Sequence, residues 1–275
     1  MIKEPNRDSA IGIFDSGLGG LTVAREIMRQ LPKEKIVYFG DTARLPYGSK
    51  SKETITRYSR QIINFLMTQD VKAIVIACNT ASSYALESVS REYDIPIIGV
   101  IEPGARTAVA STRCKNVGVI GTEGTISSKV YNRSIHAIDD SIIVSGKACP
   151  LFVPLAEEGW IYDDVTRTVA ERYLYDLKQE NIDTLILGCT HYPLLRKLVG
   201  EVMGPDVVLV NPAYETARDL KALLEATDSL RKCCSNAEEE HSFFVSDKAR
   251  SFSNFANSIL PCNIDSAHKI DIEKY

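Results

Sequence analysis

Eight short runs of this sequence are apolar throughout and rich in β-branched residues. A strand with one solvated face alternates apolar and polar residues, whereas a strand covered on both faces is apolar at nearly every position. The runs therefore predict buried strands in parallel sheets. They are IGIF (11–14), IVYF (36–39), AIVIA (73–77), IIGV (97–100), VGVI (117–120), IIVS (142–145), TLILG (184–188) and VVLV (207–210).

Segments with helical spacing lie between these runs. Apolar side chains recur there every three or four residues, which is the spacing of one helix face. Strands that alternate with helices along a whole chain are typical of the α/β class, with mostly parallel sheets and right-handed crossovers. The predicted faces are Ile55, Tyr58, Ile62, Phe65 and Leu66; Val165, Val169, Tyr173 or Leu174, and Leu177; and Ala217, Leu220, Leu223 and Leu224.

Two features of the chain occur twice, at nearly the same separation. The segments 11–26 and 117–132 both combine a strand, a glycine-containing loop with hydroxyls, and a helix. Cys78 and Cys189 both follow a strand and precede a threonine and a helix. We interpret the repeat as two related α/β units, although so degenerate a repeat is also compatible with coincidence. Ligands of open parallel sheets bind outside the carboxyl ends of the strands, so both cysteines can reach one cleft between the units.

The seven cysteines include no CxxC spacing, which argues against a disulfide framework and against a zinc finger. Cys78 and Cys189 combine a strand end, polar neighbours and a helix N-terminus, an environment that lowers the pKa of a thiol and makes the thiolate accessible. We expect the other five to act as small apolar side chains. These are Cys114, Cys149, Cys233, Cys234 and Cys262.

A matched pair of thiols suggests proton transfer on both faces of one carbon atom. Removal of an α-proton needs a base on one face, and inversion of the centre needs an acid on the opposite face. A thiolate and a thiol can serve, and they exchange roles in the reverse reaction. The alternative from another class is a redox or binding protein in which the two cysteines form a disulfide or hold a ligand without turnover.

Two loops that follow the first two strands contain glycine. DSGLGG lacks the GxGxxG spacing of a dinucleotide site and the lysine of a P-loop. It does place Asp15 and Ser16 at a strand end, before backbone amides at a helix start that can hold a carboxylate. LPYGSK (45–50) can present backbone amides in the same way. The alternative for both loops is a connecting turn.

The ionisable groups near the cysteines allow more than one interpretation. His191 is either a base for the Cys189 thiol or a satisfied loop histidine. A zinc site made by Cys78, Cys189 and His191 lacks a fourth ligand, so no metal is expected. From its pattern alone, Glu157 is an exposed loop acid. The segment CCSNAEEEH (233–241) is expected to be a solvated connection without a function.

Charge and hydropathy argue against several kinds of partner. The net charge is −4 and the basic residues are interspersed with acidic ones, so the chain has no basic stripe for nucleic acid. No apolar run approaches the ~20 residues of a membrane span, and the polar N-terminus lacks the apolar core of a signal peptide. We therefore expect a cytoplasmic protein that acts on a small molecule and binds neither nucleic acid nor membrane.

Five motifs, in the order of the chain, closely resemble those of glutamate racemases, which supply D-glutamate for bacterial peptidoglycan. They are GIFDSGLGGLTV, GDTARLPYG, ACNTAS, VIGTEGTI and LILGCTHYPLL. The resemblance covers nearly the whole chain and implies interconversion of L- and D-glutamate without a cofactor. Aspartate racemase, or another two-cysteine amino-acid racemase, is the alternative.

The resemblance also implies roles for the residues at matching positions. Cys78 and Cys189 are the implied acid/base groups, and Asp15, Glu157 and His191 are implied to assist them. The implied substrate-binding residues are Asp15, Ser16, Tyr47, Gly48, Asn79, Thr80, Thr122, Thr125, Thr190 and His191.

Two α/β domains with the active site in the cleft between them are implied as well. The first domain would comprise residues 1–97 and 210–275, completed by the C-terminal segment, and the second would comprise residues 98–209. Family members often form homodimers of varying arrangement, so the resemblance allows a homodimer without fixing its geometry. Asn211 and Pro212 stand where many relatives carry Asp-Ser, and we expect this departure to affect only loop contacts away from the reacting groups.

Overall fold

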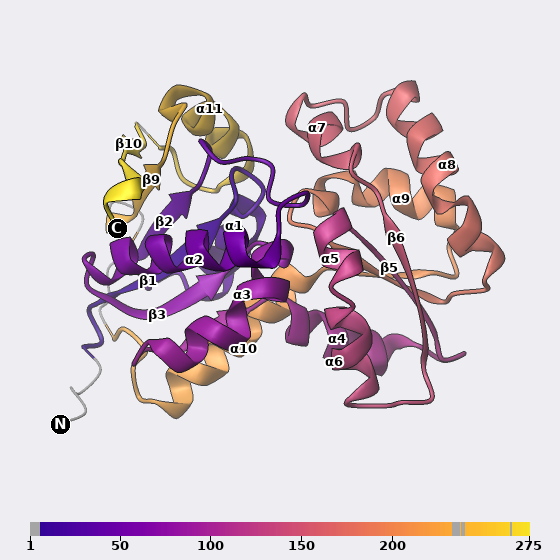
Figure 1. Ribbon diagram of the computed structural model, residues 1–275, viewed down its shortest axis with the longest axis horizontal. Coiled ribbons are helices and arrows are strands. Elements are labelled where there is room, and N and C mark those ends of the chain that lie inside the picture. The colour runs from indigo at the N-terminus through magenta and orange to yellow at the C-terminus, as the bar shows by residue number, and fades with distance from the viewer. Residues whose placement is uncertain (1–5, 233–236, 238–239, 265) are drawn as a thin grey trace.

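Two parallel sheets form the centre of the molecule (Figure 1). The computed structural model describes residues 6–232, 237, 240–264 and 266–275, with the backbone alone at residue 251. Among these residues, every strand pair in both sheets is parallel. All eight apolar runs form strands, and the prediction of an α/β fold with parallel sheets is confirmed.

The two sheets share one strand order. Without the edge strands β9 and β10, the first sheet runs β2-β1-β3-β4 and the second runs β6-β5-β7-β8. The first sheet contains β10 (His268–Lys269), β9 (Ser242–Val245), β2 (Ile36–Gly40), β1 (Ala10–Asp15), β3 (Val71–Ile76) and β4 (Ile97–Gly99). The second contains β6 (Ile143–Ala148), β5 (Asn116–Gly121), β7 (Thr184–Gly188) and β8 (Val208–Val210). The interpretation of the repeat as two related α/β units is therefore confirmed.

Helices cover both faces of each sheet (Figure 1). We call the first sheet, together with the helices that pack on it, the first unit. These helices are α1 (Leu21–Gln30), α2 (Lys52–Met67), α3 (Asn79–Glu92), α10 (Pro212–Ala226), α11 (Ala249–Ile259) and the 3-10 turn η3 (Ile272–Lys274). The second unit consists of the second sheet and the helices that pack on it. These are α4 (Ile101–Ser111), α5 (Glu123–Ser127), α6 (Val130–His136), α7 (Phe152–Glu157), α8 (Asp164–Gln179), the 3-10 turn η1 (Tyr192–Leu195) and α9 (Arg196–Met203). Neighbouring residues of a strand, such as Ile13 and Phe14, enter opposite cores, which explains why the strands are apolar throughout.

The face predicted for α8 packs against the core of the second unit except at its first residue. Leu174 and Leu177 are buried, Val169 and Tyr173 are partly buried against the same core, and Val165 is exposed. Val165 lies in the first turn, where the side chain of Asp163 caps the helix by accepting a hydrogen bond from the Val165 backbone N–H. The faces predicted for α2 and α10 are largely buried, as expected.

The C-terminal segment completes the first sheet, where β9 pairs with β2 and β10 pairs with β9. In Figure 1 this yellow and gold segment lies beside the indigo strands of the N-terminal segment. The sequence did not predict either strand, since β9 lies next to a segment interpreted as a solvated connection and β10 has only two residues. The expectation of a solvated connection is wrong for Ala237, which is buried, whereas Glu240 is exposed and pairs with Lys35. His241 is partly buried and accepts a hydrogen bond from the Ile36 N–H. Cys233 and Cys234 lie outside the described residues.

In the described part of the chain, no helix combines the length and the apolar character that a membrane crossing requires.

Candidate active site

The site lies where the central strands of both sheets end. β3 leads through Ala77 to Cys78, and β7 leads directly to Cys189. Both side chains are buried, with 5% and 6% of their surface exposed, and both are free thiols. Asn79, which directly follows Cys78, lines a void together with Cys189. The structure thus brings the loops of the two predicted thiols together, without the disulfide that the redox alternative requires.

Cys78 occupies the N-cap position of α3, where its Sγ accepts a hydrogen bond from the Ala81 N–H at 3.5 Å. Burial, and after it the charge of Asp15, raise the pKa of this thiol to about 12, against hydrogen bonds from Ala81 and Ser16 that lower it. The expectation of a lowered pKa is therefore wrong for Cys78. Removal from water disfavours the thiolate by more than one helix terminus can compensate.

Asp15, at the end of β1, is fully buried. Its Oδ2 accepts hydrogen bonds from the N–H groups of Gly17 and Gly20, at 3.1 and 2.9 Å. Its Oδ1 has no hydrogen-bond partner among the described residues. Burial raises the pKa of Asp15, although the charge of His191 and the backbone amides oppose this shift. Two of the loop amides that were expected to hold a ligand carboxylate hold this side chain instead, so that expectation is wrong for Gly17 and Gly20.

On the other side, Cys189, His191 and Glu157 form a chain of polar contacts. His191 Nδ1 lies 3.8 Å from Cys189 Sγ, and His191 Nε2 lies 2.9 Å from Glu157 Oε1. Burial lowers the pKa of His191, but the hydrogen bonds to Cys189 and Glu157 outweigh it and raise the pKa to about 10. His191 is therefore an imidazolium near neutral pH. Glu157 is the last residue of α7, and its contact with His191 contradicts the interpretation as an exposed loop acid.

Three threonine hydroxyls connect the two units beside the thiols. Thr80 Oγ1 lies 2.8 Å from Thr122 Oγ1 and 3.4 Å from Thr125 Oγ1, and the latter two are 3.1 Å apart. Thr80 belongs to the first unit, and the other two belong to the second. Close by, the carbonyl of Gly48 accepts a hydrogen bond from the Gly124 N–H at 2.8 Å. The Tyr47 hydroxyl is already engaged, because it donates to Asp41.

The start of α1 touches the Cys189 loop directly. A Cβ atom at Gly19 would lie 2.4 Å from Thr190 Oγ1 and 2.5 Å from His191 Nδ1, so only glycine fits here. Three residues later, the Thr22 hydroxyl donates to the Thr190 carbonyl at 2.9 Å. The glycine loop is the turn that connects β1 to α1, as the alternative expected, and it also brings the two units into close contact.

Comparison with known proteins agrees with this geometry. Residues 11–219 match the model of the Asp/Glu/Hydantoin racemase family. The chain belongs to this family. A glutamate racemase of Geobacter metallireducens is 50% identical over 264 residues, which are 96% of this chain and 97% of that protein.

Two solved structures of this racemase family are similar over almost their whole length. A glutamate racemase isoform from Bacillus anthracis has a TM-score of 0.93 and 40% identity, covering 97% of this chain and 98% of that one. The glutamate racemase from Francisella tularensis, in complex with D-glutamate, has a TM-score of 0.91 and 37% identity, covering 98% and 100%. The resemblance seen in the five motifs is confirmed.

In this racemase the space beside Cys189 is small. A void of about 10 Å³ is lined by residues that include Cys189, Asn79 and Asn211. Asn211 caps α10 by accepting a hydrogen bond from the Ala213 N–H, and Pro212 lines the same void. The expectation that the Asn211–Pro212 departure lies away from the reacting groups is therefore wrong. No group of three or more His, Cys, Asp or Glu side chains among the described residues is placed to hold a metal ion.

The remaining cysteines differ in their exposure to solvent. Cys149 is buried in the core of the second unit, as expected, whereas Cys114 is exposed and its Sγ approaches the Asn181 carbonyl at 3.5 Å. Sequence analysis also missed two side chains that contact the site, Thr22 and Tyr131. Thr22 lies in a recognised motif, but Tyr131 had no signal beyond its place in the repeated segment.

Proposed function

We propose that this chain is a glutamate racemase that interconverts L- and D-glutamate by removing and returning the α-proton. Cys78 and Cys189 act as the two acid/base groups, and no cofactor takes part. The observation that carries the proposal is the placement of two buried, free thiols at equivalent strand ends of two related units. A pair of bases on opposite faces of one carbon is what inversion of a stereocentre requires.

The substrate assignment rests on charge and on the relatives. The protein from Francisella tularensis was crystallised with D-glutamate. The present site offers an imidazolium at His191 and hydroxyls at Ser16, Thr80, Thr122 and Thr190, groups that can donate hydrogen bonds to carboxylates. In this proposal, Tyr47, Gly48, Asn79 and Thr125 complete the binding site, and Asp15 accepts from the substrate ammonium group.

In the proposed mechanism, different ionisable residues assist the two thiols. One cysteine, as thiolate, takes the α-proton and becomes a thiol, while the other thiol gives a proton to the opposite face and becomes a thiolate. Asp15 receives and returns a proton at Cys78, whereas His191, held by Glu157, stabilises negative charge at Cys189. An α-proton is far less acidic than a thiol, so the hydrogen-bond donors around the substrate must stabilise the carbanion as it forms.

The deciding experiment follows the circular dichroism of L-glutamate with purified protein, without added cofactor, in D₂O. We expect the signal to decay to zero and deuterium to enter at the α-carbon. Cys78→Ala and Cys189→Ala should each lower the rate by at least about a hundredfold and still bind glutamate. Cys114→Ala, at the opposite end of β7 from the site, is the matched control and should keep the wild-type rate.

Full turnover by either active-site variant would overturn the assignment of the two thiols. Racemisation of aspartate without racemisation of glutamate would instead overturn the substrate assignment.

The proposal extends to the cell and to the organisation of the chain. A glutamate racemase in the cytoplasm would supply D-glutamate for peptidoglycan, and a homodimer is the assembly that we propose for it. We also propose residues 1–97 with 210–275, and residues 98–209, as the two domains. Support comes from the C-terminal strands β9 and β10, which join the sheet of the N-terminal segment.

A further inference from the structure

Tyr131 contacts the loops of both cysteines. It lies in α6 of the second unit and is 2% exposed. Its hydroxyl donates to Asn79 Oδ1 of the first unit at 2.7 Å, and Asn79 directly follows Cys78. Its ring lies against Gly188, the residue before Cys189, where a Cβ atom would be 3.2 Å from Tyr131 Cε2. One side chain thus touches the neighbour of each thiol.

The tyrosine hydroxyl also fixes the orientation of the Asn79 amide. Burial, with a further contribution from the charge of Cys189, raises the pKa of Tyr131 far above its usual value, so the hydroxyl keeps its proton. A hydroxyl that donates to Oδ1 leaves the amide nitrogen to donate elsewhere. Asn79 and Cys189 line the same void, so the Asn79 side chain lies where the loops of the two thiols meet.

Correct placement of both loops at once is a strict requirement of two-base inversion. A misplacement of about 1 Å can cost a factor of 10² in rate. The two thiols belong to different units, so contacts between the units must set their relative position. The threonine cluster and the Gly48–Gly124 bond are further contacts of this kind. Removal of one hydroxyl therefore leaves the units joined.

We propose that Tyr131 is a positioning residue of the racemase. Its hydroxyl orients the Asn79 amide toward the substrate, and its ring supports the loop that carries Cys189. The inference rests on the proposed function, because positioning has meaning only for a reaction at both thiols.

The test compares Tyr131→Phe with Tyr93→Phe as a matched control. The Tyr93 hydroxyl also donates to an asparagine Oδ1, that of Asn64, at 2.8 Å, but within the first unit and away from both thiols. We expect Tyr131→Phe to lower kcat/KM for glutamate about tenfold, largely through KM, with a melting temperature close to that of the control. Since the equilibrium constant of racemisation is one, the loss must be equal for L- and D-glutamate. Tyr93→Phe should match the wild type.

A double variant separates positioning from general stability. If Tyr131 acts through Asn79, then Tyr131→Phe combined with Asn79→Ala should be no slower than Asn79→Ala alone. Four results would each overturn the inference. They are a wild-type kcat/KM in Tyr131→Phe, an equal loss of kcat/KM in Tyr93→Phe, additive losses of kcat/KM in the double variant, and a loss of kcat/KM no larger than the loss of folded protein. Failure of the wild-type protein to racemise glutamate, seen in the same assay, would overturn the proposed function instead.

Discussion

Cys78 and Cys189 occupy equivalent places but have charged neighbours of opposite sign. A buried carboxyl, Asp15, faces Cys78, while the imidazolium of His191 faces Cys189. Burial and the Asp15 charge raise the pKa of Cys78, so its sulfur keeps a proton, whereas His191 places a positive charge beside Cys189. The surroundings of the two thiols therefore differ, as their separate acid and base roles in the proposed reaction require.

The charge of His191 predicts a pH dependence of stability. The folded-state pKa of about 10 lies above the ordinary value of 6.5. This stabilising contribution is fully present below pH 6.5 and is lost as the pH rises through 10. We expect the free energy of unfolding, measured by urea titration without substrate, to fall by a few kcal/mol between pH 6.5 and 10.

His191→Gln should remove most of this decrease. His136→Gln, which changes a histidine that contacts the Ile142 carbonyl in the second unit, should keep it. An unchanged slope in His191→Gln would show that the imidazolium does not stabilise the fold.

The sequence was sufficient to place both thiols but not to predict their acidity. A strand end followed by a helix start is visible as a local pattern, and it correctly located Cys78 and Cys189. The pKa of Cys78 depends on burial and on Asp15, which lies 63 positions earlier in the chain. Glu157 was misjudged for the same reason, because its partner His191 comes from another element.

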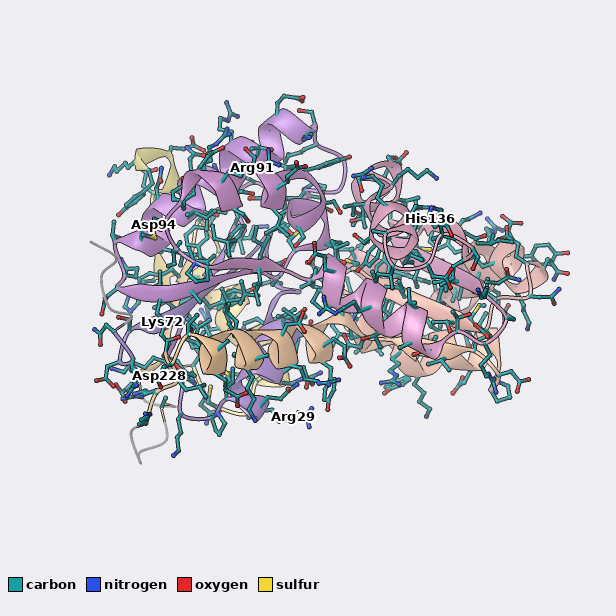
Figure 2. The ribbon with its side chains drawn as sticks, turned by 90° about the horizontal axis from the view of Figure 1, so that it is seen from below. Arg29, Lys72, Arg91, Asp94, His136 and Asp228 are labelled. Atoms are coloured by element: carbon teal, nitrogen blue, oxygen red, sulfur yellow. The ribbon has the colours of Figure 1, made fainter. Side chains whose placement is uncertain are left out.

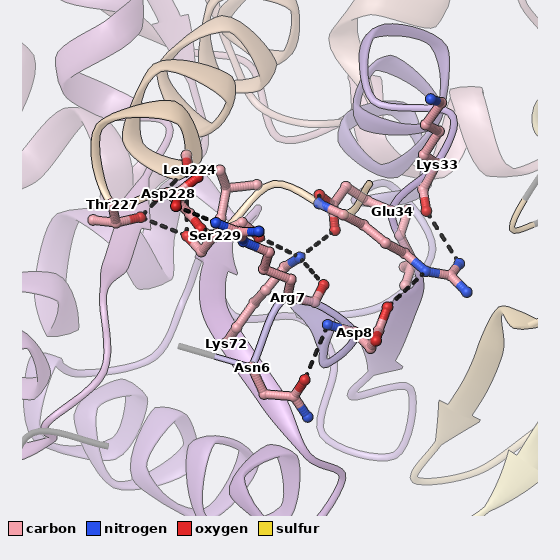
Figure 3. A network of polar contacts seen from close by, with 12 residues as sticks. Asn6, Arg7, Asp8, Lys33, Glu34, Lys72, Leu224, Thr227, Asp228 and Ser229 are labelled. Atoms are coloured by element: carbon pink, nitrogen blue, oxygen red, sulfur yellow. Dashed lines mark hydrogen bonds and ion pairs between the residues drawn. The ribbon is translucent and has the colours of Figure 1, made fainter. Parts of the chain in front are cut away.

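At the scale of elements, β3 carries a polar network at the end opposite Cys78 (Figure 3). Lys72 Nζ lies 2.6 Å from Glu34 Oε2 and donates to the carbonyls of Arg7 and Ser229, both at 2.8 Å. The side chains of Lys72 and Glu34 are each 1% exposed. The network joins the N-terminal segment, the approach to β2 and the segment after α10. Figure 2 places Lys72 and Asp228 in the first unit, far from His136 in the second.

Lys72→Met should destabilise the protein strongly without changing its catalysis. Removal of one partner from a buried ion pair leaves the other charge uncompensated and typically costs about 3–5 kcal/mol. The active site is at the other end of β3, roughly 20 Å away at 3.3 Å per residue, so kcat and KM should stay at the wild-type values. Urea unfolding and the racemisation assay measure the two effects separately.

Arg91→Met is the control for this prediction. Arg91 pairs with Glu87 on the surface of α3, where both side chains are more than three-quarters exposed, and such pairs contribute little. Equal destabilisation by Lys72→Met and Arg91→Met would contradict the role assigned to the buried network.

Local sequence patterns explain which strands and helix faces could be predicted and which could not. Apolar runs that alternate with helical segments predicted all eight strands of the repeated units. β9 and β10 extend the first sheet beyond β2 and lie outside this alternation, and the two residues of β10 carry no strand pattern of their own. On α8 the predicted face is wrong only at Val165, which lies exposed in the first turn beside the Asp163 cap.

At the scale of the molecule, loops of the two units contact each other directly at several places. The void between the Cys189 loop and the start of α10 has a volume of about 10 Å³, which is no more than one water needs. We expect the two units to separate when substrate enters between them. The repeat in the sequence predicted the two units and their shared cleft, but it could not predict these contacts. They join loops that are distant in sequence, such as Gly19 with Thr190.

Separation of the units predicts a difference between two neighbouring amides. The Gly124 N–H donates to the Gly48 carbonyl of the other unit, whereas the Ile126 N–H donates to the Thr122 carbonyl within its own unit. Opening the cleft breaks the first bond and leaves the second intact. In the free protein, amide hydrogen exchange followed by NMR should therefore be faster at Gly124 than at Ile126.

Bound glutamate should remove this difference by holding the units together. The measurement uses Cys78→Ala, which binds without turnover, at a glutamate concentration of about 100 Kd, where binding favours the bound state by about 2.7 kcal/mol. Exchange at Gly124 should then slow about a hundredfold, while Ile126 changes less. Equal protection of both amides in the free protein would mean that the units do not separate, and the substrate would need another route to the thiols.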